Sequence, residues 1–265
     1  MELMPFRRSL KTLSTHNVLT LILVLFMTSC SSKNKGSAKN FLNYKKSYSL
    51  TDKSGSFKVK REVGHYAKSK SYVTKYQVLS KQDSKKVLEQ STVLSTPGVL
   101  GKKVTILRPY KSQYNVWFDK KKYSNFMVLD TKRRGLTVKM NSPEPQWQGT
   151  KFFKFPSGTG LYCFYTQVIE CAQFTGFLKK AIKTRAGSMN FHVIWDGYPF
   201  VQEQFLNLAN SPFESAILKY DGTNENNEKR FSLSVGANSI IYFVNDDLEL
   251  VKVFWVSQGL SMVEE

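Results

Sequence analysis

Apolar and polar residues alternate with a period of two along the chain from about residue 47 to 155. Successive side chains of a β-strand point to opposite faces, so this period is typical of strands with one buried and one solvated face. Short polar segments at 119–122 and 130–135 separate the alternating runs and have the length of hairpin loops. Neighbouring strands are therefore expected to pair antiparallel in a meander, which forms an open sheet or a half-barrel. The clearest predicted strands are 57–60, 114–118 and 136–140.

A period of three to four interrupts this pattern in the middle of the chain. The apolar residues that recur there as on one helix face are Leu161, Phe164, Tyr165, Val168, Ile169 and Ala172. We expect Thr159 to cap this helix, a second helical piece to span 177–183, and Gly187 to end it. Strands resume at 191–195, 231–235, 239–244 and 250–256. Because the last two are apolar on both faces, the helical segment at about 160–185 is expected to cover one face of the sheet. The predicted fold class is mainly β (α+β).

An apolar run at 21–27 follows basic residues near the N-terminus. Its length of roughly ten residues is too short for a membrane-spanning helix, which needs about 20, and fits the apolar part of an export signal. The segment Met27-Thr28-Ser29-Cys30 resembles the lipobox of bacterial lipoproteins. The resemblance implies cleavage before Cys30 and acylation of its thiol. The alternatives are an ordinary cleaved secretory signal and an uncleaved N-terminal anchor.

The lipoprotein resemblance also implies a location and a domain organisation. Ser31, rather than aspartate, follows the cysteine, which in a Gram-negative bacterium implies the periplasmic face of the outer membrane. Residues 1–29 would be the signal peptide and 30–46 a lipidated flexible tether, because that segment is rich in Ser, Lys, Asn and Gly. Residues 47–265 would form a single β-rich domain, since no Pro/Gly/Ser-rich linker interrupts them.

Cys163 and Cys171 are the cysteines that remain, and thiols of an exported chain tend to oxidise. A disulfide needs Cα atoms closer than about 7 Å, whereas eight residues of continuous helix separate them by about 12 Å. A disulfide therefore requires a turn at 165–167 and a helix that begins near Val168. The alternative is two buried thiols on an unbroken helix.

Motifs of nucleophilic hydrolases, zinc proteases and phosphate-binding loops are absent from the sequence. The histidines, His16, His65 and His192, lie far apart and without Cys/His ligand spacing, so neither a metal nor another cofactor is expected. His192 near Asp196 would suit a general base, but a histidine within an apolar strand is more often structural. We therefore expect a protein that is not an enzyme.

The chain carries 39 basic and 20 acidic residues, a formal net charge of +19. Part of the excess lies in two predicted loops, whose basic residues are Lys120, Lys121, Lys122, Lys132, Arg133 and Arg134. Such loops attract anionic lipid or lipopolysaccharide and, with the lipid anchor, would give attachment at two points. Nucleic acid is not an expected partner, because exported proteins seldom meet it. Alternatively, the lysines only keep a β-rich surface soluble.

An exported antiparallel sheet with a helical lid is similar in architecture to the half-barrels of periplasmic lipoprotein carriers and their outer-membrane acceptors. The resemblance implies a non-catalytic envelope lipoprotein that binds an apolar ligand, a lipid chain or a partner peptide on a sheet face. The competing hypothesis is a structural or assembly factor that docks another envelope protein through a sheet edge and the basic loops.

Overall fold

The computed structural model describes residues 43–52, 55–66, 70–83, 85–101, 104–157, 160–200 and 211–265. The predicted signal peptide, Cys30 and nearly all of the predicted tether lie outside the described residues, as does Thr159. The compact unit that contains every described residue extends from Asn40 to Glu265. None of the described helices is long and apolar enough to cross a membrane.

In the described part of the chain, fifteen strands form one sheet. An N-terminal arm consists of β1 (Tyr44–Asp52), β2 (Gly55–Tyr66), β3 (Ser71–Ser80), β4 (Val87–Leu100), β5 (Val104–Phe118), β6 (Lys121–Asp130), β7 (Gly135–Asn141) and β8 (Gly149–Lys154). A C-terminal arm consists of β9 (Tyr162–Phe164), β10 (Ser188–Ile194), β11 (Phe213–Thr223), β12 (Lys229–Val235), β13 (Asn238–Val244), β14 (Leu250–Trp255) and β15 (Leu260–Glu264).

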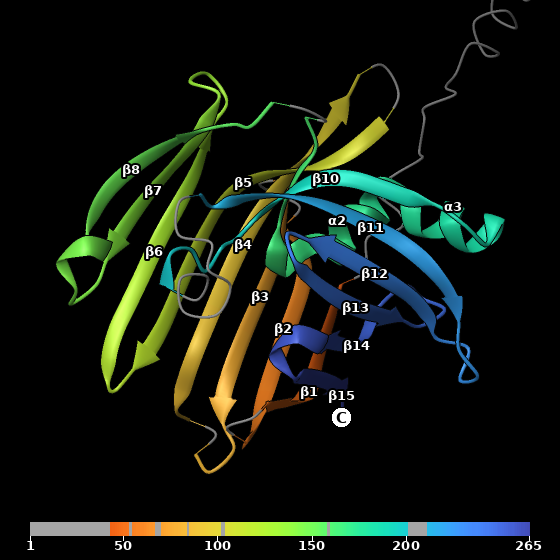
Figure 1. The fold of residues 1–265 in the computed structure, drawn as a ribbon, viewed down its shortest axis with the longest axis horizontal. Helices are drawn as coiled ribbons and strands as arrows, with labels where there is room; N and C mark the ends of the chain where they lie inside the picture. Colours follow the sequence, from red (N-terminus) through yellow and green to blue (C-terminus); the bar gives the residue numbers. More distant parts are fainter. Residues whose placement is uncertain are drawn as a thin grey trace, which may run out of the picture. The chain divides into compact units, whose positions relative to one another are not determined.

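Strand β1 joins the two arms, because it pairs with both β2 and β15 (Figure 1). The other pairings join strands that are neighbours in the chain, with β8 and β9 at the two edges of the sheet, and every pairing is antiparallel except that of β9 with β10. The predicted mainly-β class and the antiparallel meander in an open sheet are confirmed. The predicted hairpin at 119–122 is also present, with Asp119 and Lys120 both at positive φ between β5 and β6. This backbone matches the right-handed twist of the paired strands.

Alternation of buried and exposed side chains fixes the register of the strands. In β12 the inward positions are Lys229, Phe231, Leu233 and Val235, and the residues between them are exposed or half-buried. A slip of one residue would move that whole set to the solvated face, so the hydrophobic pattern allows one pairing. Strands β13 and β14 differ from the sequence expectation. Both strands are apolar on both faces, but Phe243 and Phe254 pack edge to face and stay half-buried rather than buried.

The helical segment begins later than the sequence pattern predicts. Residues 162–164 form β9, a 3₁₀ turn follows as η3 (Tyr165–Gln167), and then α2 (Val168–Phe174) and α3 (Phe177–Thr184). The predicted helical start at 161–164 was wrong because β9 is buried on both faces, and a short continuous apolar run cannot be distinguished from a helix by period alone. The predicted second piece is confirmed as α3. It ends at Arg185, which has the left-handed conformation, rather than at Gly187.

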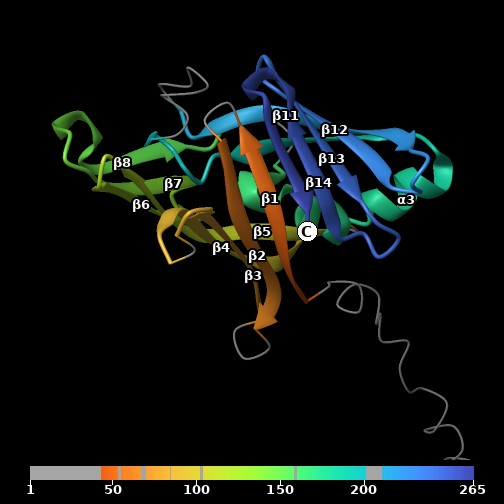
Figure 2. The same ribbon diagram turned by 90° about the horizontal axis from the view of Figure 1, so that it is seen from below.

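The helical segment lies between the two arms. Residues of η3 contact β3 and β4, α2 contacts β5, and α3 contacts β11. Figure 2 shows α2 between strands of the N-terminal arm and those of the C-terminal arm. The predicted packing of a central helical segment on one face of the sheet is therefore confirmed.

Candidate functional site

A cavity of about 170 Å³ lies between the arms, and residues of η3 and α2 form part of its wall. Strands β1 to β5 contribute Leu50, Arg61, Tyr76, Glu89 and Tyr114 to the lining. The C-terminal arm and the segment after β10 contribute Trp195, Asp196, Tyr242, Val253 and Trp255. Residues from eleven different elements or loops thus meet only in the folded chain.

Aromatic side chains form much of the wall. The Tyr165 ring centroid lies 4.6 Å from that of Trp195 and 5.8 Å from that of Trp255. The two indole rings are stacked, with centroids 6.0 Å apart and planes inclined by 16°. Tyr242 lies in the same wall. Tyr76 and Tyr114 face this cluster from the N-terminal arm.

Two carboxyl groups lie in the cavity wall. Asp196 is 2 % exposed and accepts hydrogen bonds from the Ser91 hydroxyl, the Thr166 hydroxyl and, at 3.2 Å, the Thr166 backbone N–H. Burial raises the pKa of Asp196, and these hydrogen bonds oppose that shift. Asp196 belongs to the turn after β10, so its position depends on both β4 and η3.

Glu89 is the second carboxyl, on the inner face of β4. Burial raises its pKa to about 7, the Tyr114 hydroxyl opposes the shift, and the charge of Asp196 adds to it. Among the described residues, neither Glu89 nor Asp196 forms an ion pair with a lysine or arginine. The two acids therefore share a largely aromatic space without a paired cation.

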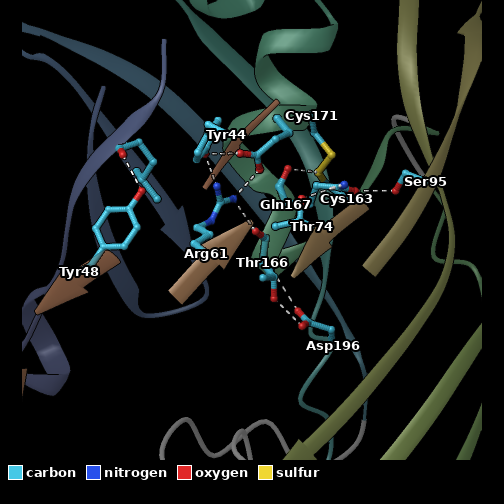
Figure 3. A network of polar contacts seen from close by, with 12 residues as sticks. Tyr44, Tyr48, Arg61, Thr74, Ser95, Cys163, Thr166, Gln167, Cys171 and Asp196 are labelled. Atoms are coloured by element: carbon cyan, nitrogen blue, oxygen red, sulfur yellow. Dashed lines mark hydrogen bonds and ion pairs between the residues drawn. A yellow bond between two sulfur atoms is a disulfide. The ribbon is translucent and has the colours of Figure 1, made fainter. Parts of the chain in front are cut away.

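Arg61, the basic residue in the wall, is already paired (Figure 3). Its guanidinium donates to the Glu170 carboxylate at 2.7 Å, to the Thr166 carbonyl oxygen at 3.1 Å and to the Tyr44 hydroxyl. Tyr44 in turn donates to the other oxygen of Glu170 at 3.1 Å. Burial alone would lower the pKa of Arg61, but the Glu170 carboxylate outweighs it and raises that pKa. The charge of Arg61 is thus balanced within the protein.

A disulfide and a buried glutamine hold η3 beside the cavity. Cys163 and Cys171 are bonded, with Cα atoms 6.4 Å apart, so the predicted disulfide is confirmed. The residues between them contain the turn and the helix start at Val168 that this bond requires, which excludes the alternative of an unbroken helix. Gln167, fully buried, accepts from the Ser95 hydroxyl at 2.6 Å and donates to the Thr74 hydroxyl at 3.1 Å.

The six basic residues predicted to bind an anionic surface are all exposed, but they do not form one patch. Lys120, Lys121 and Lys122 lie at the β5–β6 turn, whereas Lys132, Arg133 and Arg134 lie in the β6–β7 turn. These turns stand at opposite ends of β6 (Figure 1). The ten residues of that strand span about 30 Å. The six residues cannot form one positive rim, because consecutive hairpin loops of a meander alternate between its two ends.

Sequence reasoning did not single out Glu89, and it considered Asp196 only beside His192. His192 instead stacks on Tyr162, with ring centroids 5.4 Å apart, and burial lowers its pKa. A signal for Glu89 exists: it shares the inward face of β4 with Ser91 and Val93, where a carboxyl is unusual. The described residues contain no group of three or more His, Cys, Asp or Glu side chains placed to hold a metal ion.

Comparison with known proteins finds a distant structural similarity and no similarity in sequence. No family model matches the chain, and no curated protein matches it. Among solved structures, it is similar to a β-barrel-like protein of domain of unknown function DUF1849 from Brucella abortus. The sequences are 9% identical and the TM-score is 0.47, over 85% of this chain and 97% of that chain.

Proposed function

We propose that this chain is an exported, non-catalytic lipoprotein, anchored through Cys30, that binds a small apolar group in the cavity between its two arms. The cavity carries the proposal, because ligand sites are typically concave and lined mostly by apolar and aromatic side chains, with a few polar groups that fix orientation. Here aromatic rings form much of the wall, and Glu89 and Asp196 supply the polar groups.

The volume limits the ligand. A cavity of about 150 Å³ lined by apolar side chains holds one benzene molecule. The 170 Å³ available here therefore fits a ring-sized group, the end of a lipid chain or one side chain of a partner peptide. A whole diacyl lipid is too large. Binding would bury the group against side chains from both arms.

Filling the cavity tests this function. Val253 lies in the cavity wall on β14 and is 6 % exposed, so Val253→Phe places extra atoms in the space that a ligand needs. We expect calorimetric titration of the full-length chain with benzyl alcohol and hexan-1-ol to detect binding to the parent and at least tenfold weaker binding to the variant. The matched control is Val256→Phe, three residues along the chain and 65 % exposed, which should bind as the parent does. No binding of either alcohol to the parent would overturn the proposal.

Anchoring has a separate test. Cys30→Ser should leave an uncleaved precursor that fatty acid does not label, because the thiol that accepts the lipid is absent. The measurement is metabolic labelling with radioactive palmitate in a Gram-negative host, together with the mass of the mature chain. A variant that is still cleaved after Ser29 and still labelled would end the lipoprotein assignment and leave the cavity proposal standing.

A further inference from the structure

The charges that line the cavity do not balance. Glu89 and Asp196 have no paired cation among the described residues, while the guanidinium of Arg61 is neutralised by Glu170 at 2.7 Å. An anionic ligand would therefore meet two acids and no available base. A positively charged ligand would be attracted by two carboxyl groups and would meet no cation that competes for them.

The aromatic wall favours the same sign of charge. The face of an aromatic ring is electronegative, so tryptophan and tyrosine attract cations, and the attraction strengthens when water is excluded. Tyr165, Trp195 and Trp255 lie within 6.0 Å of one another by ring centroids, and Tyr76, Tyr114 and Tyr242 complete the set in the wall. Aromatic cages of this composition are used by proteins to recognise quaternary ammonium groups.

We propose that the group bound in this cavity carries an organic ammonium ion, which lies against the aromatic rings and faces the carboxyl groups of Glu89 and Asp196. The inference rests on the proposed function, since it names the ligand chemistry of the same cavity. The size agrees, because a trimethylammonium group fills about as much space as a small ring, which is what 170 Å³ holds.

The site predicts a pH dependence of binding. Tyr76, Tyr114, Asp196 and the paired Arg61 line the cavity together with Glu89. Burial raises the pKa of Glu89 to about 7, so Glu89 is partly protonated at neutral pH. An ammonium ion favours the ionised form of Glu89. The affinity for the ammonium ion is therefore expected to be lower at pH 6 than at pH 8. A neutral ligand gains nothing from that ionisation.

The test compares choline with 3,3-dimethylbutan-1-ol, which has the same shape with carbon in place of the charged nitrogen. Butylammonium and butan-1-ol make the same comparison for a primary amine. For the full-length chain at pH 8, we expect that in at least one of these two pairs of compounds the cation binds at least about tenfold more tightly than the neutral compound. Glu89→Gln should weaken binding of that cation about tenfold and leave the neutral compound unchanged. The control Glu225→Gln, in the exposed β11–β12 turn, should change neither.

The outcomes separate the two proposals. Equal binding within both pairs, or a Glu89→Gln variant that binds the cation as well as the parent does, overturns the ammonium proposal and leaves the apolar cavity intact. If no alcohol and no cation binds, the proposed function fails as well. Circular dichroism of Glu89→Gln establishes that the variant is folded, and Asp196→Asn provides a second variant with the same expected direction.

Discussion

At the scale of single residues, the buried ion pair between Arg61 and Glu170 connects four segments. Arg61 comes from β2, Glu170 from α2, Tyr44 from β1, and the Thr166 carbonyl from η3. Both charged side chains are less than 5 % exposed. Removing one partner would leave the other charge buried without compensation, which is the costly case for an ion pair.

Glu170→Gln is expected to lower the free energy of unfolding by about 3 kcal/mol or more, because the Arg61 charge stays buried. Urea unfolding at neutral pH measures the change. The control is Glu62→Gln: its ion pairs with Lys45 and Lys75, each 3.5 Å long, are partly exposed, so that variant should lose less than about 1 kcal/mol. Equal losses in the two variants would contradict the structural role of the buried pair.

Glu89 should make the free energy of unfolding depend on pH. Its pKa rises from 4.5 to about 7 on folding, so the folded chain binds the proton more tightly than the unfolded chain does. The corresponding stability is full below pH 4.5 and is lost as the pH rises through 7, with a total of about 3 kcal/mol. We expect Glu89→Gln to flatten the fall in unfolding free energy between pH 5 and 8, measured by urea unfolding. Glu225→Gln should keep the parent slope, and an unchanged slope in Glu89→Gln would contradict the shift.

At the scale of elements, the segment from β9 to α2 decides the shape of the site. The chain leaves β9 at Phe164, turns through η3 and enters α2 at Val168, while the disulfide connects the strand to the helix across that turn. Tyr165 and Thr166 of the turn face the cavity, where Thr166 binds Asp196 and Tyr165 packs on the two tryptophans. Constraining this turn therefore preforms one wall of the cavity.

Replacing Cys163 and Cys171 together by alanine should lower the unfolding free energy by roughly 2 to 3 kcal/mol, the scale for closing a loop of this length. Urea unfolding of the oxidised proteins measures the loss, and the same comparison in reductant is the control, where the difference should vanish. We also expect weaker binding of benzyl alcohol, since η3 loses a constraint. Two free thiols in the non-reduced parent protein would overturn this prediction.

At the scale of the whole sheet, antiparallel order assigns each loop to one of two ends. Strand β1 begins at Tyr44, which pairs near the end of β2, and following the register through β3, β4 and β5 places the β6–β7 turn at that same end. The β5–β6 turn lies at the other end, about 30 Å away along β6. The β6–β7 turn is therefore at the end of the sheet where β1 begins, and β1 is the described strand closest in sequence to the proposed anchor at Cys30.

The two basic loops should therefore contribute unequally to binding of an anionic membrane. Screening shortens electrostatic attraction to about 10 Å at 0.1 M salt, so charges at the far end of β6 contribute little. Changing Lys132, Arg133 and Arg134 to glutamine should weaken association of the protein, in its proposed lipid-anchored form, with phosphatidylglycerol vesicles, by up to about 1 kcal/mol for each charge. The matched variant at Lys120, Lys121 and Lys122 should bind nearly as the parent does. Flotation assays measure both, and equal effects would contradict the end assignment.

The sequence by itself predicted the mainly-β class, the antiparallel meander and the positions of seven of the fifteen described strands. Period-two alternation and short polar loops specify an antiparallel meander, because the pleat and the hairpin are local properties. The Cys163–Cys171 disulfide was also accessible, since helix geometry made the bond and the turn at 165–167 depend on each other. Sequence reasoning failed at β9, where burial on both faces removes the alternation that identifies a strand.

Only the tertiary structure decided which residues line the cavity. Glu89 and Asp196 are 107 positions apart along the chain, and each is an ordinary acidic residue until burial raises its pKa. The charge of Asp196 adds to the shift of Glu89. The pairing of β1 with β15 brings the two arms around α2, and that closure joins Tyr165, Trp195 and Trp255 into one wall. Local patterning cannot encode this arrangement, because burial, ion pairing and the cavity itself depend on contacts between residues that are distant in sequence.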